Sequence, residues 1–186
     1  SSCGQPGLLT SVEIMDDEEN ILQPNQSGEI VVRGRLIMAG YYNDTEATAD
    51  VTTSSGWHRT GDIGYRDEEG YIYIRDRKKD MIISGGFNIY PSEVEQVIWT
   101  HPSVQDCAVI GTPDDKWGEA VTAVIELKPG EQVSESEIVD ICKNELGSVK
   151  APKIVHFWDE LPRSAVGKVR KKDIRDHYWE GFDRRI

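Results

Sequence analysis

The chain has 186 residues, of which 38% are hydrophobic and 29% charged, and its net charge is −12. This length accommodates one domain or two small ones, and the composition is that of a globular chain rather than a disordered one. The acidic balance argues against general nucleic-acid binding, which depends on neutralising phosphates, and no apolar run is long enough to span a bilayer.

The three cysteines do not form a recognisable pattern. Cys3, Cys107 and Cys142 are widely spaced, with no CxxC motif. We therefore predict neither a disulfide framework nor a metal site. No secretory signal is visible in the first residues, so a cytoplasmic location is expected.

Residues 1–76 have the pattern of β structure. Four runs rich in β-branched and aromatic residues, at 8–15, 29–35, 62–66 and 71–75, predict strands. The last two runs flank Asp67-Glu68-Glu69-Gly70, which predicts a hairpin with Gly70 closing the turn.

From residue 77 onward the pattern changes to mixed helices and strands. Ser92 with Glu95, and Ser134 with Glu137, have the spacing of capping boxes at two helix starts. Gly147 is expected to end the second helix. Strands are predicted at 121–127 and 154–158, and a final helix at 171–179.

The predicted fold class is therefore α+β. A β-barrel-like subdomain fragment occupies residues 1–76, and a small α/β domain with a short sheet flanked by helices occupies residues 81–186. Between them, residues 77–80 form a charged stretch that suits a linker or hinge. The charge also changes along the chain, because residues 163–186 carry eight basic and four acidic side chains on an otherwise acidic molecule. This cationic end predicts local handling of one anionic ligand.

Two glycine-containing segments allow two interpretations each. Thr60-Gly61-Asp62 is typical of a turn, but an aspartate there can also accept hydrogen bonds from both hydroxyls of a ribose. The Gly85-Gly86 pair is typical of a hairpin or bulge, and alternatively lets a slender ligand pass close to the backbone.

Lys168 follows Gly167 in a third such segment. The segment is not a phosphate-binding P-loop, because Pro162 stands where a glycine is required and Val169 replaces the Ser or Thr. Lys168 is either a solvated lysine or a side chain that reaches into a site and neutralises phosphate charge.

Taken in order, six motifs resemble the later motifs of the adenylate-forming enzymes, the superfamily of acyl-CoA synthetases, beetle luciferases and peptide-synthetase adenylation domains. They are GEIVVRG at 28–34, GYYN at 40–43 with EAT at 46–48, GWHRTGD at 56–62, DRKKD at 76–80, the segment at 85–95, and LPRSAVGKVR at 161–170. The sequence SGGFNIYPSEVE at 84–95 is similar to the acid–CoA ligase form, and the resemblance covers nearly the whole chain.

The resemblance implies a two-step reaction in which a carboxylic acid and ATP give acyl-AMP, and CoA then displaces AMP. It implies that Asp62 and Arg77 bind the nucleotide, that Lys79 is the hinge residue and that Lys168 is the catalytic lysine of adenylation. Gly85 and Gly86 would line the passage for the pantetheine arm of CoA. Trp117 and Lys150 are further candidates for CoA contacts, although Trp117 could equally be a core aromatic residue and Lys150 merely exposed.

The family's upstream phosphate loop, adenine-binding segment and acyl pocket do not occur in this sequence. The chain therefore resembles the C-terminal third of such an enzyme, and its partners would include the missing N-terminal part. Mg2+ is expected for the parent enzyme, with its ligand outside this chain. We expect the chain alone to be inactive. Three alternatives remain open: a non-catalytic binding or regulatory module of the same fold, a partner chain that supplies the missing motifs, and an aryl-acid rather than a fatty-acid ligase.

Overall fold

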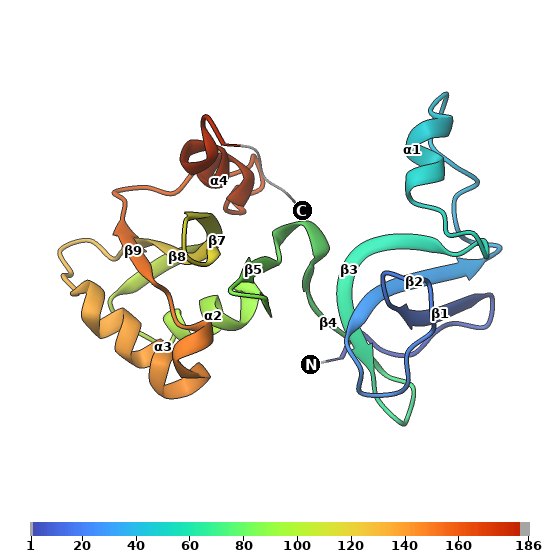
Figure 1. The fold of residues 1–186 in the computed structure, drawn as a ribbon, viewed down its shortest axis with the longest axis horizontal. Coiled ribbons are helices and arrows are strands. Elements are labelled where there is room, and N and C mark those ends of the chain that lie inside the picture. Colours follow the sequence, from blue (N-terminus) through green and yellow to red (C-terminus); the bar gives the residue numbers. More distant parts are fainter. Residues whose placement is uncertain (1, 183–186) are drawn as a thin grey trace. The chain divides into compact units, whose positions relative to one another are not determined.

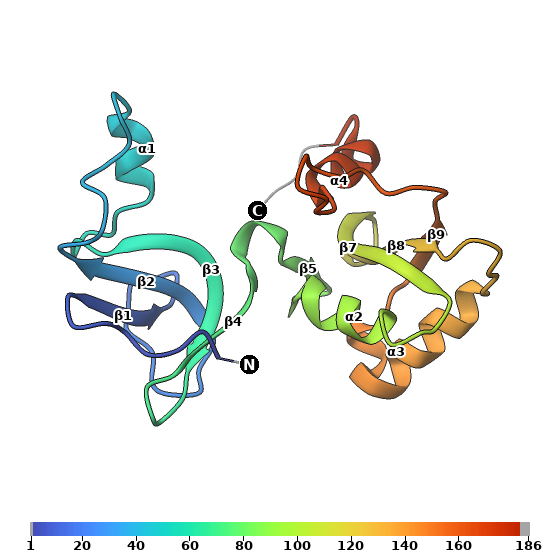
Figure 2. The same ribbon diagram turned by 180° about the vertical axis from the view of Figure 1, so that it is seen from behind.

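The computed structural model describes residues 2–182 and divides into two compact units, Ser1–Lys79 and Asp80–Ile186. Figures 1 and 2 show the units from opposite sides. Within the described residues, no helix combines the length and the apolar character needed to cross a membrane.

The first unit is built on one antiparallel sheet in the order β1-β2-β3-β4. The strands are β1 (Thr10–Met15), β2 (Gly28–Gly34), β3 (His58–Arg66) and β4 (Ile72–Arg77), and a short helix α1 (Thr45–Asp50) lies between β2 and β3 in the chain. All four predicted strands are present, although β3 starts four residues earlier than predicted. The β3–β4 hairpin is confirmed, with Arg66 paired to Ile72 and Gly70 at φ +87°.

The sheet of the first unit is open among the described residues, so the barrel-like expectation holds only as a fragment. The segment before β1 extends it, because Gly4 forms an antiparallel bridge with Ile72 of β4. Two small apolar clusters cover parts of the sheet, one around Ile14, Ile30 and Ile72 and one around Met15, Val31 and Trp57. Several large apolar side chains of this unit are exposed: Leu8, Leu9, Leu36, Tyr41 and Tyr42.

The charged stretch between the units is partly ordered secondary structure. Arg77 belongs to β4, where it pairs with Asp62, and a single 3₁₀ turn, η1 (Lys78–Asp80), follows directly. The predicted linker residues 77–80 therefore comprise the last residue of a strand and one short turn.

The second unit contains a five-stranded sheet with helices on both faces (Figure 1). Its strands are β5 (Ile82–Ser84), β6 (Phe87–Ile89), β7 (Val104–Asp114), β8 (Gly118–Leu127) and β9 (Ile154–Phe157), and its helices are α2 (Pro91–Ile98), α3 (Glu135–Lys150) and α4 (Lys171–Trp179). The strand order is β6-β5-β8-β7, and β9 pairs with β8 in parallel.

Alternate residues of β7 face two separate cores. Cys107 and Val109 pack with Ile98 of α2 and Ile138 of α3, whereas Ala108 and Ile110 pack with Leu161 and with Ile174 of α4. Because both faces are covered here, residues 107–110 of β7 are apolar without interruption rather than alternating. β7 was not predicted from the sequence.

The two predicted capping boxes had different outcomes. The Ser134 hydroxyl accepts a hydrogen bond from the Glu137 amide at 3.2 Å, and α3 breaks at Gly147, where φ is +79°. The box at Ser92 and Glu95 is wrong. The α2 helix has Tyr90 as its N-cap without a side-chain cap, and the Glu95 side chain is buried, where it accepts a hydrogen bond from the Val109 amide of β7.

Candidate functional site

Asp62 and Arg77, the two predicted nucleotide-binding residues, lie opposite each other on β3 and β4. Their Cα atoms are register partners, and Arg77 Nε lies 2.9 Å from Asp62 Oδ1. The Arg77 side chain is 58% exposed and that of Asp62 22%. The antiparallel ladder thus brings together residues that are 15 positions apart, with their charged groups open to solvent.

The Thr60-Gly61-Asp62 segment is an irregularity inside β3 rather than a turn between strands. The register of the β2–β3 pair shifts here, and Gly61 adopts φ +73°, a conformation that favours glycine. Two hydrogen bonds hold the segment: Thr60 donates from Oγ1 to the Ile30 carbonyl oxygen at 2.8 Å, and the Asp62 amide donates to Thr60 Oγ1 at 3.1 Å. This bulge sets the direction in which Asp62 projects.

The buried side chain of Glu29 holds the bulge at Gly61 in place. Its side chain is 5% exposed and forms ion pairs of 3.1 Å with Arg59 and with Lys78, and one of its oxygens accepts a hydrogen bond from the Gly61 amide. Burial acts to lower the pKa of Lys78, but its hydrogen bonds to Asp17 and Glu29 outweigh burial and raise the pKa above its ordinary value. Lys78 is therefore a cation at neutral pH.

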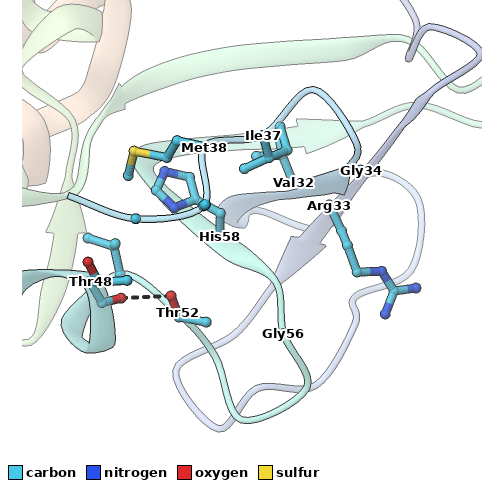
Figure 3. A pocket seen from close by; sticks show the side chains of 12 residues that line it. Val32, Arg33, Gly34, Ile37, Met38, Thr48, Thr52, Gly56 and His58 are labelled. Carbon is cyan, nitrogen blue, oxygen red and sulfur yellow. Dashed lines mark hydrogen bonds between the residues drawn. The ribbon is translucent and has the colours of Figure 1, made fainter. Parts of the chain in front are cut away.

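The first unit has two hollows, one of them at these residues. One has a volume of about 410 Å³ and is lined by residues that include Glu29, Arg59, Gly61 and Lys78. The other, of about 230 Å³, lies between α1 and the end of β2, where Thr52 donates a hydrogen bond to the Thr48 carbonyl oxygen (Figure 3). No predicted site residue lines this second hollow.

Lys168 lies in a tight turn of the second unit. The Gly167 amide donates to the Ser164 carbonyl oxygen and the Ser164 amide to the Lys168 carbonyl oxygen, both at 2.8 Å, and Gly167 has φ +81°. Arg163 and Val169 form an antiparallel bridge at the base. The turn exposes Lys168 to solvent.

Arg163, which was not predicted as a site residue, attaches the base of this turn to the sheet. Its guanidinium forms ion pairs with Asp106 of β7 at 2.7 Å and with Glu126 of β8 at 3.0 Å, and it donates a further hydrogen bond to the Gly167 carbonyl oxygen. The hydrogen bonds to Asp106 and Glu126 raise the pKa of Arg163 above its ordinary value. The base of the turn that carries Lys168 is thus tied to β7 and β8.

Gly85, Gly86 and Trp117 come together at the β5–β6 hairpin. The two glycines form its two-residue turn, with φ +58° and +83°, and the Gly85 amide donates to the Trp117 carbonyl oxygen at 2.8 Å. A Cβ atom on Gly85 would lie 2.7 Å from the Trp117 ring, whereas one on Gly86 would meet open space. Trp117 is 37% exposed, so it is not a core residue.

Lysines other than Lys150 surround Trp117. The ammonium of Lys116 lies 4.7 Å from the centre of the Trp117 ring and that of Lys153 lies 5.9 Å from it. Lys150 instead forms an ion pair with Glu93 of α2. Lys116 and Lys153 were not predicted as site residues. Lys116 is adjacent to Trp117 in the sequence, whereas Lys153 is 36 positions away and has no local signal.

Metal-binding side chains do not converge in the described part of the chain. Among residues 2–182, no three histidine, cysteine, aspartate or glutamate side chains are grouped so that they could hold a metal ion. The three cysteines are unpaired, and burial raises the pKa of the Cys142 thiol to about 11.

The chain resembles known proteins along nearly its whole length. Residues 93–168 match the family model of the AMP-binding enzyme C-terminal domain. The chain is 42% identical to a medium/long-chain-fatty-acid–CoA ligase of Mycobacterium tuberculosis, with 100% of this chain and 34% of that protein covered. It is 43% identical to an indoleacetate–CoA ligase of Aromatoleum aromaticum, with 94% and 34% covered.

Solved structures give the same result. ATP-bound MatB from Rhodopseudomonas palustris has a TM-score of 0.90 at 36% identity, with 98% of this chain and 36% of that chain covered. The o-succinylbenzoate CoA synthetase of Bacillus subtilis, in complex with its acyl-adenylate intermediate, has a TM-score of 0.85 at 39% identity, with 94% and 35% covered.

These matches confirm the family resemblance predicted from the motifs. Residues 93–168 match the C-terminal domain of AMP-binding enzymes, and nearly the whole chain is similar to acid–CoA ligases. The chain spans about a third of the length of these relatives.

Proposed function

We propose that this chain is part of an AMP-forming acid–CoA ligase. In the first step an oxygen of the carboxylic acid attacks the α-phosphorus of ATP and pyrophosphate leaves, giving acyl-AMP. In the second step the CoA sulfur attacks the acyl carbonyl carbon and AMP leaves, giving the thioester. Two thirds of the relatives' length lies outside this chain, so we expect these 186 residues to contribute to both steps without completing either.

The observation that carries the proposal is the Asp62–Arg77 pair. A carboxylate can accept hydrogen bonds from both hydroxyls of a ribose, and a guanidinium beside it can contact the ribose or a phosphate. The bulge at Gly61 projects Asp62 from the sheet, and both groups are accessible to solvent. This combination on one surface can bind a nucleotide.

Lys168 is proposed as the catalytic lysine of adenylation. Negative charge concentrates between the attacking carboxylate and the α-phosphate, and a positioned ammonium stabilises it there. The tight turn leaves the Lys168 side chain exposed while its base is tied to β7 and β8. Such a side chain can enter a site supplied by another part of the enzyme.

The cluster at Gly85, Gly86 and Trp117 is proposed to contact CoA. Two glycines without side chains let the pantetheine arm pass close to the backbone, and the exposed Trp117 ring can pack against it. Lys116 and Lys153 lie where they can neutralise phosphate groups of CoA. Lys150 remains a proposed contact, but it would have to leave its ion pair with Glu93.

We further propose that residues 1–76 end the large adenylating domain, that residues 77–80 with Lys79 are the hinge, and that residues 81–186 are the mobile domain. The proposed partners are the N-terminal part of the enzyme, ATP with Mg2+, CoA and a carboxylic acid, in the cytoplasm. When bound with ATP, Mg2+ would neutralise phosphate charge, and its ligands would come from outside the described residues.

The test separates the two half-reactions in the full-length enzyme. Lys168→Ala should lower ATP–pyrophosphate exchange by at least about 100-fold, since one positioned electrostatic group is lost. Thioester formation from supplied acyl-AMP should stay within a few-fold of the parent enzyme. Lys172→Ala, which removes an exposed lysine four residues away, is the matched control and should change neither rate.

Equal loss of both half-reactions in Lys168→Ala would contradict the role of Lys168. Pyrophosphate exchange by the 186-residue chain alone would contradict its dependence on the missing part. If the full-length protein catalyses neither step and calorimetry detects neither AMP nor CoA binding, a non-catalytic module of the same fold is the better description.

Two classes of carboxylic acid are candidates for the substrate. The relatives named above include a fatty-acid ligase and an indoleacetate ligase at nearly equal identity, 42% and 43%. We propose a fatty acid, with an aryl acid as the alternative. Pyrophosphate exchange by the full-length enzyme, measured with matched aliphatic and aromatic acids, decides between them.

A further inference from the structure

The β5–β6 hairpin, whose turn is Gly85-Gly86, is attached to the central sheet over a short length. Among the described residues, the β5–β8 ladder has a single pair of register partners, Ser84 and Gly118. Beyond this pair, the Gly85 amide donates to the Trp117 carbonyl oxygen at 2.8 Å. The two glycines therefore lie at the end of a very short ladder, where local opening is easiest.

The Glu119 side chain adds a contact on the other side of that pair. Its Oε2 accepts a hydrogen bond from the Ile83 amide at 2.9 Å, and the residue is only 6% exposed. Ile83 and Gly85 are two positions apart, so their amides are directed to the same edge of the hairpin. One amide meets a backbone oxygen of Trp117 and the other meets a carboxylate oxygen. The Glu119 side chain therefore takes the place of a backbone acceptor and lengthens the attachment of β5.

Gly111 of β7 leaves room for this carboxylate. A Cβ atom at position 111 would lie 2.7 Å from Glu119 Oε2, closer than such atoms approach in proteins. The φ angle of Gly111 lies outside the left-handed region, so its backbone conformation does not call for glycine. A glycine inside a strand weakens the sheet and often marks a close approach of another group. Here the group that approaches is the carboxylate of Glu119.

We propose that Glu119 is a positioning residue for the proposed thioester step. It holds the Gly85-Gly86 turn next to Trp117, so that the passage for the pantetheine arm of CoA keeps its shape. Burying a carboxylate is costly unless the group is hydrogen-bonded, and here a hydrogen bond goes to the strand that carries the turn. Glu119 thus acts through the backbone of the hairpin. The inference rests on the proposed function, because CoA binding gives the turn its use.

The first experiment measures amide hydrogen exchange at Ile83 and Gly85 in the 186-residue chain. Glu119→Met removes the acceptor and keeps a side chain of similar length. Both amides should then exchange at least about tenfold faster, since local opening of the hairpin becomes easier. Glu119→Gln keeps an oxygen acceptor and should exchange at close to the parent rate. Asp115→Ala is the matched control, because it removes an exposed acid from the nearby β7–β8 loop and should change neither exchange rate.

The second experiment measures the two half-reactions in the full-length enzyme. Glu119→Met should lower kcat/KM for CoA, in thioester formation from supplied acyl-AMP, by about 10- to 100-fold, since a small displacement of a binding surface is costly in rate. ATP–pyrophosphate exchange should stay within a few-fold of the parent enzyme. Glu119→Gln should recover most of the thioester rate, and Asp115→Ala should retain it. A residue that only stabilised the domain would lower both half-reactions together.

Gly111→Ala is a second variant that displaces the same carboxylate without altering Glu119 itself. It should reproduce both effects of Glu119→Met, namely faster exchange at Ile83 and Gly85 and a slower thioester step. If Glu119→Met does not fold, Gly111→Ala provides the same test.

Unchanged exchange at Ile83 and Gly85 in both variants would overturn the inference, and so would faster exchange with an unchanged thioester rate. Equal loss of both half-reactions would mean that Glu119 stabilises the domain and does not position the turn. A parent enzyme that forms no thioester would refute the proposed function, and the exchange measurement, which requires no catalysis, would still decide whether Glu119 holds the turn. An active parent enzyme with equally active variants would refute the positioning role alone.

Discussion

Asp62 and Lys168 are the two charged groups on which the proposed reaction depends, and the protein holds them in different ways. Asp62 belongs to a strand: its backbone is part of a β ladder, and its side chain pairs with Arg77 on the next strand. Lys168 belongs to a turn whose own backbone makes only local hydrogen bonds.

The turn that contains Lys168 is attached by side chains at both ends. Before Lys168, Arg163 binds Asp106 and Glu126. After it, Lys171 binds the buried carboxylate of Glu95. A side chain on a β ladder, such as Asp62, keeps its place throughout the proposed catalytic cycle. A side chain on a short turn that is attached at both ends, such as Lys168, can be presented to a site formed by another part of the enzyme. The difference suits a binding residue on one side and a catalytic residue that enters and leaves on the other.

The largest effect is expected when the anchor after Lys168 is broken. Lys171 lies 2.8 and 2.9 Å from the two carboxylate oxygens of Glu95, whose side chain is 5% exposed. Lys171→Met leaves that carboxylate buried without its cation, which costs about 3–5 kcal/mol. Urea denaturation of the 186-residue chain should show this loss in the free energy of unfolding of the second unit.

Lys172→Met is the control for this loss. The side chain of Lys172 is exposed on the next position of the same helix, so its replacement should change the free energy of unfolding by no more than about 0.5 kcal/mol. Equal stability of the two variants would mean that the buried Glu95 does not depend on Lys171 and that other contacts hold α4.

The anchor before Lys168 should matter for rate. Arg163→Met in the full-length enzyme removes the contacts to Asp106, Glu126 and the Gly167 carbonyl oxygen, so the turn loses its attachment to the sheet. Because small displacements of a positioned group cost up to about 100-fold in rate, we expect a loss of that order in pyrophosphate exchange.

A positioning role has a signature that a merely structural role lacks. Thioester formation from supplied acyl-AMP should be unaffected in Arg163→Met, and Arg163→Lys should recover only part of the exchange rate, since lysine cannot bind two carboxylates through a planar fork. If both half-reactions fall together, Arg163 stabilises the domain and does not position Lys168.

Much of the fold could be predicted from the sequence because its signals are local. The final helix was predicted at 171–179, and α4 spans the same residues. The β3–β4 hairpin followed from turn chemistry. By contrast, β7 and the true environment of Glu95 depend on which elements cover the sheet on each face. A buried glutamate and a capping glutamate have the same local spacing, and only the tertiary structure distinguishes them.

The candidate site was predicted only in part, for a similar reason. Motifs indicated Asp62, Arg77 and Lys168, and the structure adds that the first two form an ion pair. Arg163 and Glu29, which support these residues, were not predicted, because their partners are distant in sequence: Arg163 contacts residues 37 and 57 positions away. Supporting contacts of this kind have no local pattern.

The smallest effect on stability is expected on the strand side of the comparison. Arg77 is 58% exposed, and exposed ion pairs contribute less than about 1 kcal/mol. Arg77→Ala should therefore hardly change the free energy of unfolding of the first unit, because the β3–β4 ladder and the Gly61 bulge keep Asp62 in place. Arg66→Ala, which removes the Arg66–Glu13 ion pair of the same sheet, is the control.

Ligand affinity separates the two arginine variants. In the full-length enzyme, Arg77→Ala should weaken AMP binding measured by calorimetry, since the guanidinium beside Asp62 is lost, while Arg66→Ala should leave AMP binding unchanged. Weaker AMP binding with almost no change in the free energy of unfolding would mean that Arg77 serves to bind the nucleotide and not to stabilise the sheet. If Arg77→Ala instead destabilises the unit and binds AMP normally, the pair with Asp62 holds the sheet together, and the nucleotide must be bound by other residues.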